Sequence, residues 1–324
     1  MLAYIIRRIL MGIPTVLGVL FILFALFFWI ASPELMAKRV LGEKAKEEQI
    51  QQWIKEKGYD LPKFYNEEAS GLSKITETRF ANYYKRMLTF NFGRSDQDNI
   101  SITQKMKNGV GPSLMLTVPI FVASLLISVF ISMLIAIFRG TYVDRVALFM
   151  CVIGMSVVYF LYIIGAQYFV GKVLKWFPIS GWSDNHPYYF LILPIIVGII
   201  ASLAGNIRFY RTVMVNEVNN DYIRTARAKG LGEGGILFRH LLKNAMIPIL
   251  TNVVMAIPFL FMGSLLMESF FGIPGLGYLT VKAIQNNDFS TVSAVVYISS
   301  LIYVVANLFT DISYTFVDPR VKLK

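Results

Sequence analysis

The sequence predicts an all-α integral membrane protein with six transmembrane helices and a helical extracytoplasmic insertion between the first and second spans. Three observations predict this fold. The 324 residues are 56% hydrophobic and only 16% charged, with a mean hydropathy of +0.57, whereas soluble proteins carry about 25% charged residues. Six apolar runs approach or exceed the roughly 20 residues that a helix needs to cross the bilayer. Lys and Arg gather on one side of these runs, as they do in cytoplasmic loops.

The predicted spans follow one another with polar loops between them. They cover residues 9–31, 114–138, 146–171, 189–207, 247–267 and 292–316. The first span follows Arg7 and Arg8, which resembles the basic start of a signal peptide. Its apolar core of 23 residues exceeds the roughly 7–15 residues of such peptides, so we expect an uncleaved anchor.

Positive charge predicts the orientation. With a cytoplasmic N-terminus, the cytoplasmic ends and loops hold 14 Lys and Arg, and the short outer loops hold three. This asymmetry places both termini in the cytoplasm. We expect three parts: residues 1–32 with the first span, residues 33–112 as the outer insertion, and residues 113–324 as a five-helix core.

The outer insertion has the pattern of a small helical bundle. Ile50, Trp53 and Ile54 form an apolar stripe, while Glu47 and Gln51 stand four residues apart as on one helix face. Two or three short helices are expected. The residues leave two roles open, a solvated helical cap without chemistry or a docking surface for an extracytoplasmic partner.

The basic cytoplasmic loop 208–246 is the most informative polar segment. Asn219, Asn220 and Asp221 favour a helix start, because their side chains accept the free amide protons of a first turn. A short helix follows, and Gly230 ends it, since glycine adopts left-handed dihedrals at a helix C-terminus. After a glycine corner, a second helix is expected from about Ile236.

Small and basic residues combine on the first of these two helices. Ala226 and Gly230 lie four residues apart and hence on one face, and Arg224, Arg227 and Lys229 surround them. This arrangement suits an elbow that enters a partner's groove, and it equally suits a basic loop held at lipid headgroups.

Several function classes are excluded or weakened. The chain has no G-x-x-x-x-G-K-[ST] phosphate loop, so it does not hydrolyse nucleotide itself. One cysteine and two histidines give no metal site, and the basic balance comes with apolar runs, which disfavours nucleic acid as a partner. An intramembrane serine protease is disfavoured because His186 and His240 fall in loops on opposite sides of the bilayer, and a catalytic Ser must contact a His. No catalytic residue is therefore expected.

The sixth span contains two polar residues on one face, Asn307 and Asp311. An ionisable residue inside the bilayer is a functional candidate, and hydrogen bonding between helices is the other role open to this pair. Neither residue forms a proton-relay chain with neighbours, which leaves an ion-coupled carrier poorly supported.

Motifs along nearly the whole chain carry a resemblance. They are Tyr4–Leu10 before Pro14, Phe92–Ser95, Trp176–Gly181, Asp221–Leu231, Glu268–Gly277, Asn307–Asp311 and Asp318–Arg320. Together they resemble the inner-membrane permease subunit, of the first or B type, in bacterial ABC importers for dipeptides, oligopeptides and nickel. Asp221–Leu231 is similar to the EAA loop of that family, with Arg224 in place of the glutamate.

The resemblance implies a type I ABC importer permease fold in the bacterial inner membrane and assigns roles to residues. The implied ATPase-coupling loop is Asp221, Tyr222, Arg224, Thr225, Ala226, Arg227, Ala228, Lys229, Gly230 and Leu231. The implied outer gate or re-entrant turn is Glu268, Phe271, Pro274, Gly275 and Gly277, with Asn307 and Asp311 as the intramembrane polar pair.

The resemblance also implies partners. They are a second permease subunit, two cytoplasmic ABC ATPases that bind ATP and Mg, an extracytoplasmic solute-binding protein and the lipid bilayer; this chain itself needs no cofactor. The long outer segment and the ending look closest to the oligopeptide branch. Nickel or another non-peptide solute stays open as an alternative.

Overall fold

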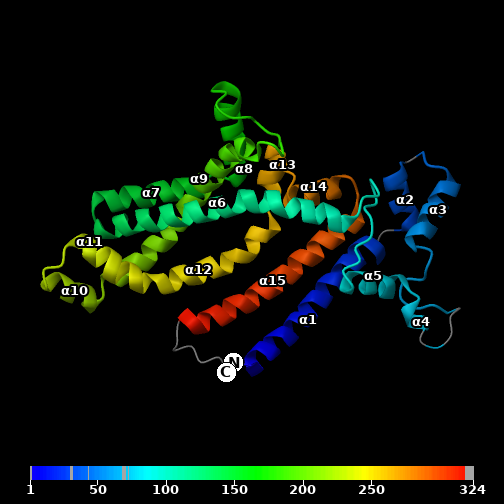
Figure 1. Ribbon diagram of the computed structural model, residues 1–324, viewed down its shortest axis with the longest axis horizontal. Helices are drawn as coiled ribbons and strands as arrows, with labels where there is room; N and C mark the ends of the chain where they lie inside the picture. Colours follow the sequence, from blue (N-terminus) through cyan, green and yellow to red (C-terminus); the bar gives the residue numbers. More distant parts are fainter. Residues whose placement is uncertain (1, 30–31, 43, 68–70, 72, 318–324) are drawn as a thin grey trace. The chain divides into compact units, whose positions relative to one another are not determined.

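The computed structural model describes residues 2–29, 32–42, 44–67, 71 and 73–317, without the side chains of 2–5, 28–29 and 311–317. Every named element in these residues is a helix, and one isolated bridge pairs Arg94 with Ser101. The predicted all-α class is confirmed (Figure 1).

The helices follow in a simple order (Figure 1). α1 (Leu2–Phe24) continues as a π-helical segment, Ala25–Trp29, and precedes α2 (Pro33–Leu41), α3 (Glu47–Lys57), α4 (Ser73–Thr76) and α5 (Arg79–Leu88). α6 (Ile102–Ile137), α7 (Tyr142–Ser156), α8 (Tyr159–Ala166) with the π-helical segment Gln167–Val173, α9 (Pro187–Val218) and α10 (Asp221–Ala228) come next. The chain continues through α11 (Glu233–Gly235), the π-helical segment Ile236–Leu241, α12 (Leu242–Met262), α13 (Leu265–Phe271), α14 (Leu276–Gln285) and α15 (Phe289–Val317).

Five helical stretches of the described chain are long and apolar enough to cross a membrane. They cover residues 6–27, 102–137, 187–218, 233–262 and 289–310. The pair 142–156 and 159–173 passes the same test together but bends by 86°, so the described chain has six candidate spans if that pair counts as one. These candidate spans follow one another in the predicted order.

The prediction of one continuous third helix over 146–171 is wrong. Val157 and Val158 both adopt extended backbone angles between α7 and α8, which β-branched side chains favour. The hydroxyl of Tyr162 donates to the carbonyl of Gly154 at 2.9 Å. This bond satisfies a backbone acceptor that the helix end leaves free, and it stabilises the bend.

The fifth span also differs from the prediction of 247–267. Helix runs without interruption from Glu233 to Met262, so the second helix of the cytoplasmic loop is the start of this span. Gly263, with φ of 73°, ends it. Ser264 then caps a separate helix, accepting a hydrogen bond from the Met267 amide at 3.4 Å. Glu268 consequently lies outside the span that it was expected to close.

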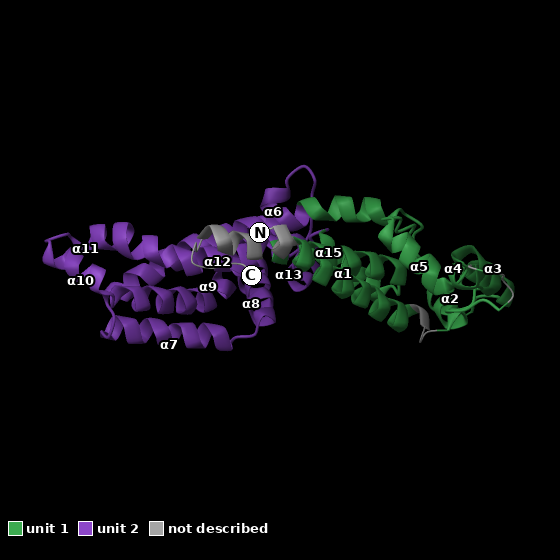
Figure 2. Cartoon of the chain, turned by 90° about the horizontal axis from the view of Figure 1, so that it is seen from below, with its two compact units in different colours: residues 1–111, 275–308 green, residues 112–274, 309–324 purple. Residues whose placement is uncertain are grey.

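The chain divides into two compact units, residues 1–111 with 275–308 and residues 112–274 with 309–324 (Figure 2). In the first unit, the core joins α1 and α15 to the outer helices. Phe24 makes edge-to-face contacts with Phe64 and Phe80. The outer insertion contains four helices where two or three were expected, and its predicted apolar stripe is buried, including Ile50 at 1% exposure.

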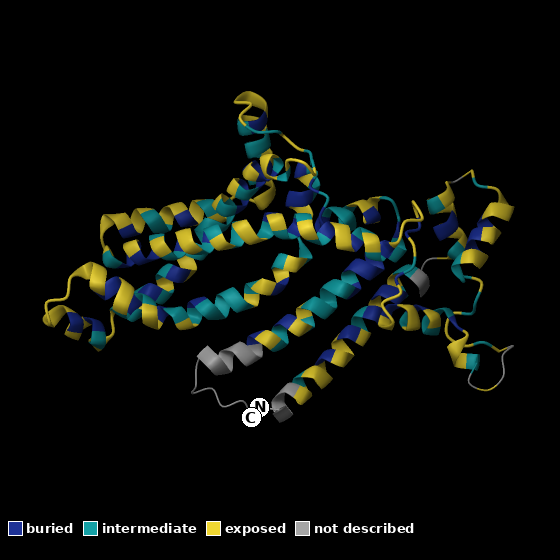
Figure 3. Cartoon of the chain, viewed as in Figure 1, coloured by how far each residue is buried: buried dark blue, intermediate teal, exposed yellow. Residues whose placement is uncertain are grey.

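The second unit has two apolar clusters. One includes Met133, Tyr210, Met214, Ile223 and Leu241, and holds the basic loop 208–246 against α6 and α9. The other consists of Leu116, Ile163, Leu191, Leu193, Val197, Met267, Phe271 and Ile273. Large apolar side chains stay exposed along the spans (Figure 3). Such exposure is expected where helices face lipid.

Candidate functional site

The predicted cytoplasmic elbow is present, with the predicted boundaries. α10 begins at Asp221 after Asn220, which has extended angles, although the Asn220 side chain bonds to Glu217 Oε2 at 2.8 Å and does not cap the helix. Gly230 has φ of 78°. Its amide donates to the Arg227 carbonyl at 2.9 Å, and the Leu231 amide donates to the Ala226 carbonyl at 3.3 Å. The left-handed glycine therefore ends the helix as predicted.

The inner face of α10 packs on its own chain. Ile223 is fully buried and Ala226 is 4% exposed, both in the cluster with Met214 and Leu241. The expectation that Ala226 and Gly230 form one open face of small residues is wrong at Ala226. Residues three apart share a helix face, and Ile223 turns that face toward the apolar cluster.

The outer face of the elbow is exposed and charged (Figure 3). Its exposed residues are Asp221, Arg224, Thr225, Arg227, Ala228, Lys229, Gly230 and Leu231, while Tyr222 is half-buried. The Arg224 side chain is 75% exposed and stands 3.7 Å from Asp221. A polar face beside the exposed apolar side chain of Leu231 is suited to protein docking.

An internal ion pair fixes the glycine corner. Arg227 donates from Nε and Nη2 to the two carboxylate oxygens of Glu233 at 2.8 and 3.1 Å. The hydrogen bonds to Glu233 raise the pKa of Arg227 above its ordinary value. Bidentate geometry restrains both side chains, so the start of α11 is held against the end of α10.

A second ion pair supports the base of the loop, and sequence reasoning missed it. Arg211 on α9 donates to Asp144 on α7 through two bonds of 2.7 Å, and the Gly140 amide donates to the same carboxylate at 3.0 Å. Arg139 bonds to Asn219 just before α10. The sequence shows only an acidic residue, Asp144, at the start of an apolar helix, and it does not identify Arg211 as its partner.

The structure also brings together two of the motifs on the predicted outer side. Glu268 is fully buried. Its Oε1 accepts hydrogen bonds from Ser113 Oγ at 2.8 Å and from the Ser264 amide at 3.0 Å. The carbonyl of Phe271 accepts a bond from the Gly181 amide at 2.8 Å. The segment 176–181 is thus tied to α13, and α13 to α6.

The rest of the predicted turn packs in the first unit. Gly275 and Gly277 flank the start of α14, and Gly277 is buried. A Cβ built on Gly109 would lie 3.2 Å from the carbonyl carbon of Gly275. The close approach explains the glycine at position 109, a residue to which the sequence reasoning assigned no role.

We expect Glu268→Ala to destabilise the protein by about 1–3 kcal/mol, because two hydrogen-bond donors lose this buried acceptor. Glu268→Gln keeps an acceptor oxygen in a side chain of the same shape, so it should reduce the stability of the protein less than Glu268→Ala does. Thermal unfolding of the purified variants in detergent measures the difference. Equal midpoints for the alanine and glutamine variants would contradict this role for the acceptor.

A hydrogen-bonded network also joins the loop 92–101 to the start of α15 within the first unit. Asp288, 2% exposed, accepts bonds from Ser95 Oγ at 2.5 Å, the Asp96 amide at 3.0 Å and Thr291 Oγ1 at 2.6 Å. Asp96 in turn accepts bonds from Lys57 at 2.7 Å and from the Ser290 amide at 3.1 Å. We call Ser95, Asp96, Asp288 and Thr291 the outer clasp.

The predicted intramembrane pair is described only in part. Asn307 lines a cavity of about 200 Å³ with Arg8, Gly12, Thr15 and other residues of α1 and α15. The side chain of Asp311 and the ending 318–320 lie outside the described residues. In the described part of the chain, no three His, Cys, Asp or Glu side chains form a cluster suited to a metal ion.

Comparison with known proteins gives a consistent result. Residues 128–323 match the family model described as binding-protein-dependent transport system inner membrane component. The chain is 32% identical to a probable peptide ABC transporter permease protein of Sinorhizobium fredii over 260 residues, which are 79% of this chain and 83% of the relative.

Two further relatives match over their whole length. The chain is 30% identical to the oligopeptide transport system permease protein AppB of Bacillus subtilis over 330 residues, covering 99% of this chain and 100% of the relative. It is also 30% identical to the glutathione transport system permease protein GsiC of Salmonella choleraesuis over 324 residues, with both chains fully covered.

Proposed function

This chain belongs to the inner membrane components of binding-protein-dependent transport systems, and from that premise we propose that it forms a peptide pathway together with a second permease subunit. The family inferred from the motifs is confirmed, and with it a multi-pass ABC importer permease of the bacterial inner membrane. Peptide is the proposed cargo because matched relatives are named for peptide, oligopeptide and glutathione transport.

We propose that the elbow, Asp221–Leu231, docks on one of the two cytoplasmic ATPases of the importer, which bind ATP and Mg. The observation that carries the proposal is the division of α10 into a buried inner face and an exposed charged outer face. An inner face fixed to α6 and α9 makes the elbow a firm attachment point, and the outer face is open to a partner.

The helix after the elbow supports the proposed transmission of movement. Helix is continuous from Glu233 to Met262, so a displacement at the corner is carried along 30 residues into the spanning segment. Rigid helices that shift between two packed arrangements are a common means of switching. ATP-driven closure of the ATPases would thereby change which side of the membrane the pathway faces.

The predicted orientation in the membrane determines where the remaining partners would bind. Both termini and the elbow are proposed to face the cytoplasm, from the distribution of Lys and Arg. The insertion 33–112 is then extracytoplasmic, and its helices α2 to α5 are the proposed surface for a solute-binding protein.

Reversal of single charges tests the elbow. We expect Arg224→Glu to weaken co-purification of the ATPases by about tenfold, because a charge facing the partner is reversed. Arg227→Glu should also weaken it, because two carboxylates then face each other at the corner. Pairing Arg227→Glu with Glu233→Arg rebuilds the internal ion pair and should restore association.

Arg145→Glu is the matched control, since it reverses an exposed charge in the first turn of α7, on the same proposed side of the membrane. Pull-down of the ATPases with each variant measures association. Wild-type recovery with both Arg224→Glu and Arg227→Glu would refute docking through this face.

A further inference from the structure

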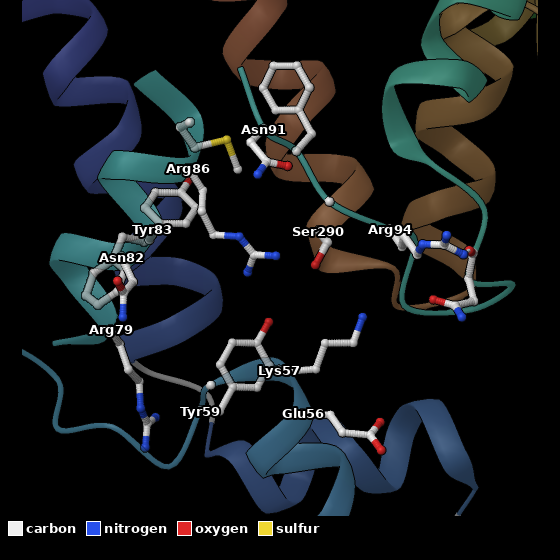
Figure 4. A pocket seen from close by; sticks show the side chains of 16 residues that line it. Glu56, Lys57, Tyr59, Arg79, Asn82, Tyr83, Arg86, Asn91, Arg94 and Ser290 are labelled. Carbon is white, nitrogen blue, oxygen red and sulfur yellow. Dashed lines mark hydrogen bonds between the residues drawn. The ribbon is translucent and has the colours of Figure 1, made fainter. Parts of the chain in front are cut away.

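The first unit contains a pocket of about 320 Å³ whose lining is basic on one side and apolar on the other. Its charged lining residues are Lys57, Arg79, Arg86 and Arg94 against Glu56 alone. Figure 4 shows the Arg86 guanidinium, the Lys57 ammonium and the hydroxyls of Tyr59 and Ser290 around the same open volume, with Glu56 directed away from it.

Three of the four cations already have partners. Lys57 is paired with Asp96 at 2.7 Å, Arg79 Nε donates to the Leu61 carbonyl at 2.5 Å, and Arg94 donates to the Asn99 carbonyl at 3.1 Å. The Arg86 guanidinium forms no ion pair or hydrogen bond with any residue that the structure describes. It points into the pocket and has its donors available (Figure 4).

Backbone geometry makes room for this guanidinium. Gly93 has φ of 73°, and a Cβ at that position would lie 2.9 Å from Arg86 Nη2. Burial and the nearby Asp96 raise the pKa of Tyr59 far above its ordinary range and keep its hydroxyl protonated, beside Ser290. The pocket therefore presents the planar guanidinium of Arg86 next to a neutral Tyr59.

The position of the pocket indicates the source of an anion. Phe24 lies near the end of the span 6–27, and Ser290 lies in the first turn of the span 289–310. The pocket thus adjoins one end of each candidate span, at the end of α1 opposite the N-terminus. Phe24, Met87 and Phe92 give the pocket an apolar wall at this level.

We propose that this pocket binds the phosphate group of an anionic phospholipid headgroup at the bilayer surface, with Arg86 as its main ligand. Guanidinium and phosphate form paired, charge-assisted hydrogen bonds. The excess of cations disfavours a zwitterionic headgroup, whose ammonium they repel. The apolar wall and the adjoining span ends favour a lipid over a soluble anion.

Native mass spectrometry of the purified full-length protein, titrated with dioleoylphosphatidylglycerol, tests the proposal. We expect Arg86→Gln to lower lipid affinity by about tenfold, as for the loss of a charge-assisted pair. The lipid affinity of Arg86→Lys should fall between those of the wild type and Arg86→Gln, because lysine keeps the positive charge but lacks the planar guanidinium. Lys85→Gln is the matched control, since it removes the same charge one residue away from the pocket lining and should bind as wild type.

Two further arms identify the ligand. Dioleoylphosphatidylcholine should bind more weakly than the anionic lipid, and glycerol 3-phosphate should compete only at far higher concentration. Equal binding of the two lipids, or competition by glycerol 3-phosphate at lipid concentrations, would overturn the lipid assignment. If Arg86→Gln does not fold, Arg86→Lys must weaken binding in its place; unchanged affinity in the folded Arg86 variants would likewise overturn the proposal.

Discussion

Gly230→Trp is expected to abolish peptide uptake by the assembled importer and to release ATP hydrolysis from its dependence on the binding protein. A Cβ on Gly230 meets no atom within 4 Å, so the indole would extend away from this chain and into the proposed ATPase groove. The left-handed φ of 78° adds a strain of about 1–2 kcal/mol for any non-glycine residue. Uptake of labelled peptide and ATPase rate, measured on the same preparation, report the two effects.

Two variants separate strain from obstruction. Gly230→Ala imposes the same backbone strain without the ring and should keep most of the uptake. Gly140→Trp is the matched control, because Gly140 has φ of 76°, no atom within 4 Å of its Cβ, and a place in the loop between α6 and α7, on the same proposed side of the membrane. Normal coupling in Gly230→Trp, or equal loss in Gly140→Trp, would contradict docking at the elbow.

Asp288→Ala is expected to destabilise the first unit by about 2–3 kcal/mol, because several buried hydrogen-bond donors lose their acceptor. Ser95, the Asp96 amide and Thr291 all donate to this carboxylate. The loop 92–101 should then open to proteases. Thermal unfolding and limited proteolysis of the purified protein measure both changes.

Asp98→Ala is the control on the same loop. Asp98 pairs with Lys105 at 2.7 Å, and its side chain is 41% exposed. An exposed pair contributes at most about 1 kcal/mol, so this variant should remain close to wild type. An equal loss of stability in both variants would show that the outer clasp has no special role.

The elements set by local pattern were predictable. Apolar length gave the spans, and the order Asn220, Asp221 and then Gly230 gave both ends of α10. These features depend on residues close in the chain, where helix propensity and glycine dihedrals act directly.

Features that depend on tertiary packing were not predictable. The bend at Val157–Val158 contains no proline, and the preceding Gly154 and Ser156, like valine, are compatible with a continuous helix in a span. The inward direction of Ala226 follows from the apolar cluster around Met214 and Leu241, which the loop sequence alone does not contain.

Long-range partners account for the rest. Ser95 and Asp288 are 193 residues apart in the chain, so neither residue indicates the other in a single sequence. The same holds for the basic pocket, since Lys57, Arg86 and Ser290 come from α3, α5 and α15. The charge pattern predicts only that the insertion is polar. The fold determines that Arg86 is the pocket cation without a partner among the described residues.

Reconstitution in liposomes tests most directly whether a separate motor drives this pathway. The purified chain alone should not concentrate peptide, with or without ATP. Addition of the second permease, the ATPases and the binding protein should produce uptake that requires ATP hydrolysis and is lost with Gly230→Trp. Accumulation of peptide by the chain alone, without any nucleotide-hydrolysing partner, would contradict the account.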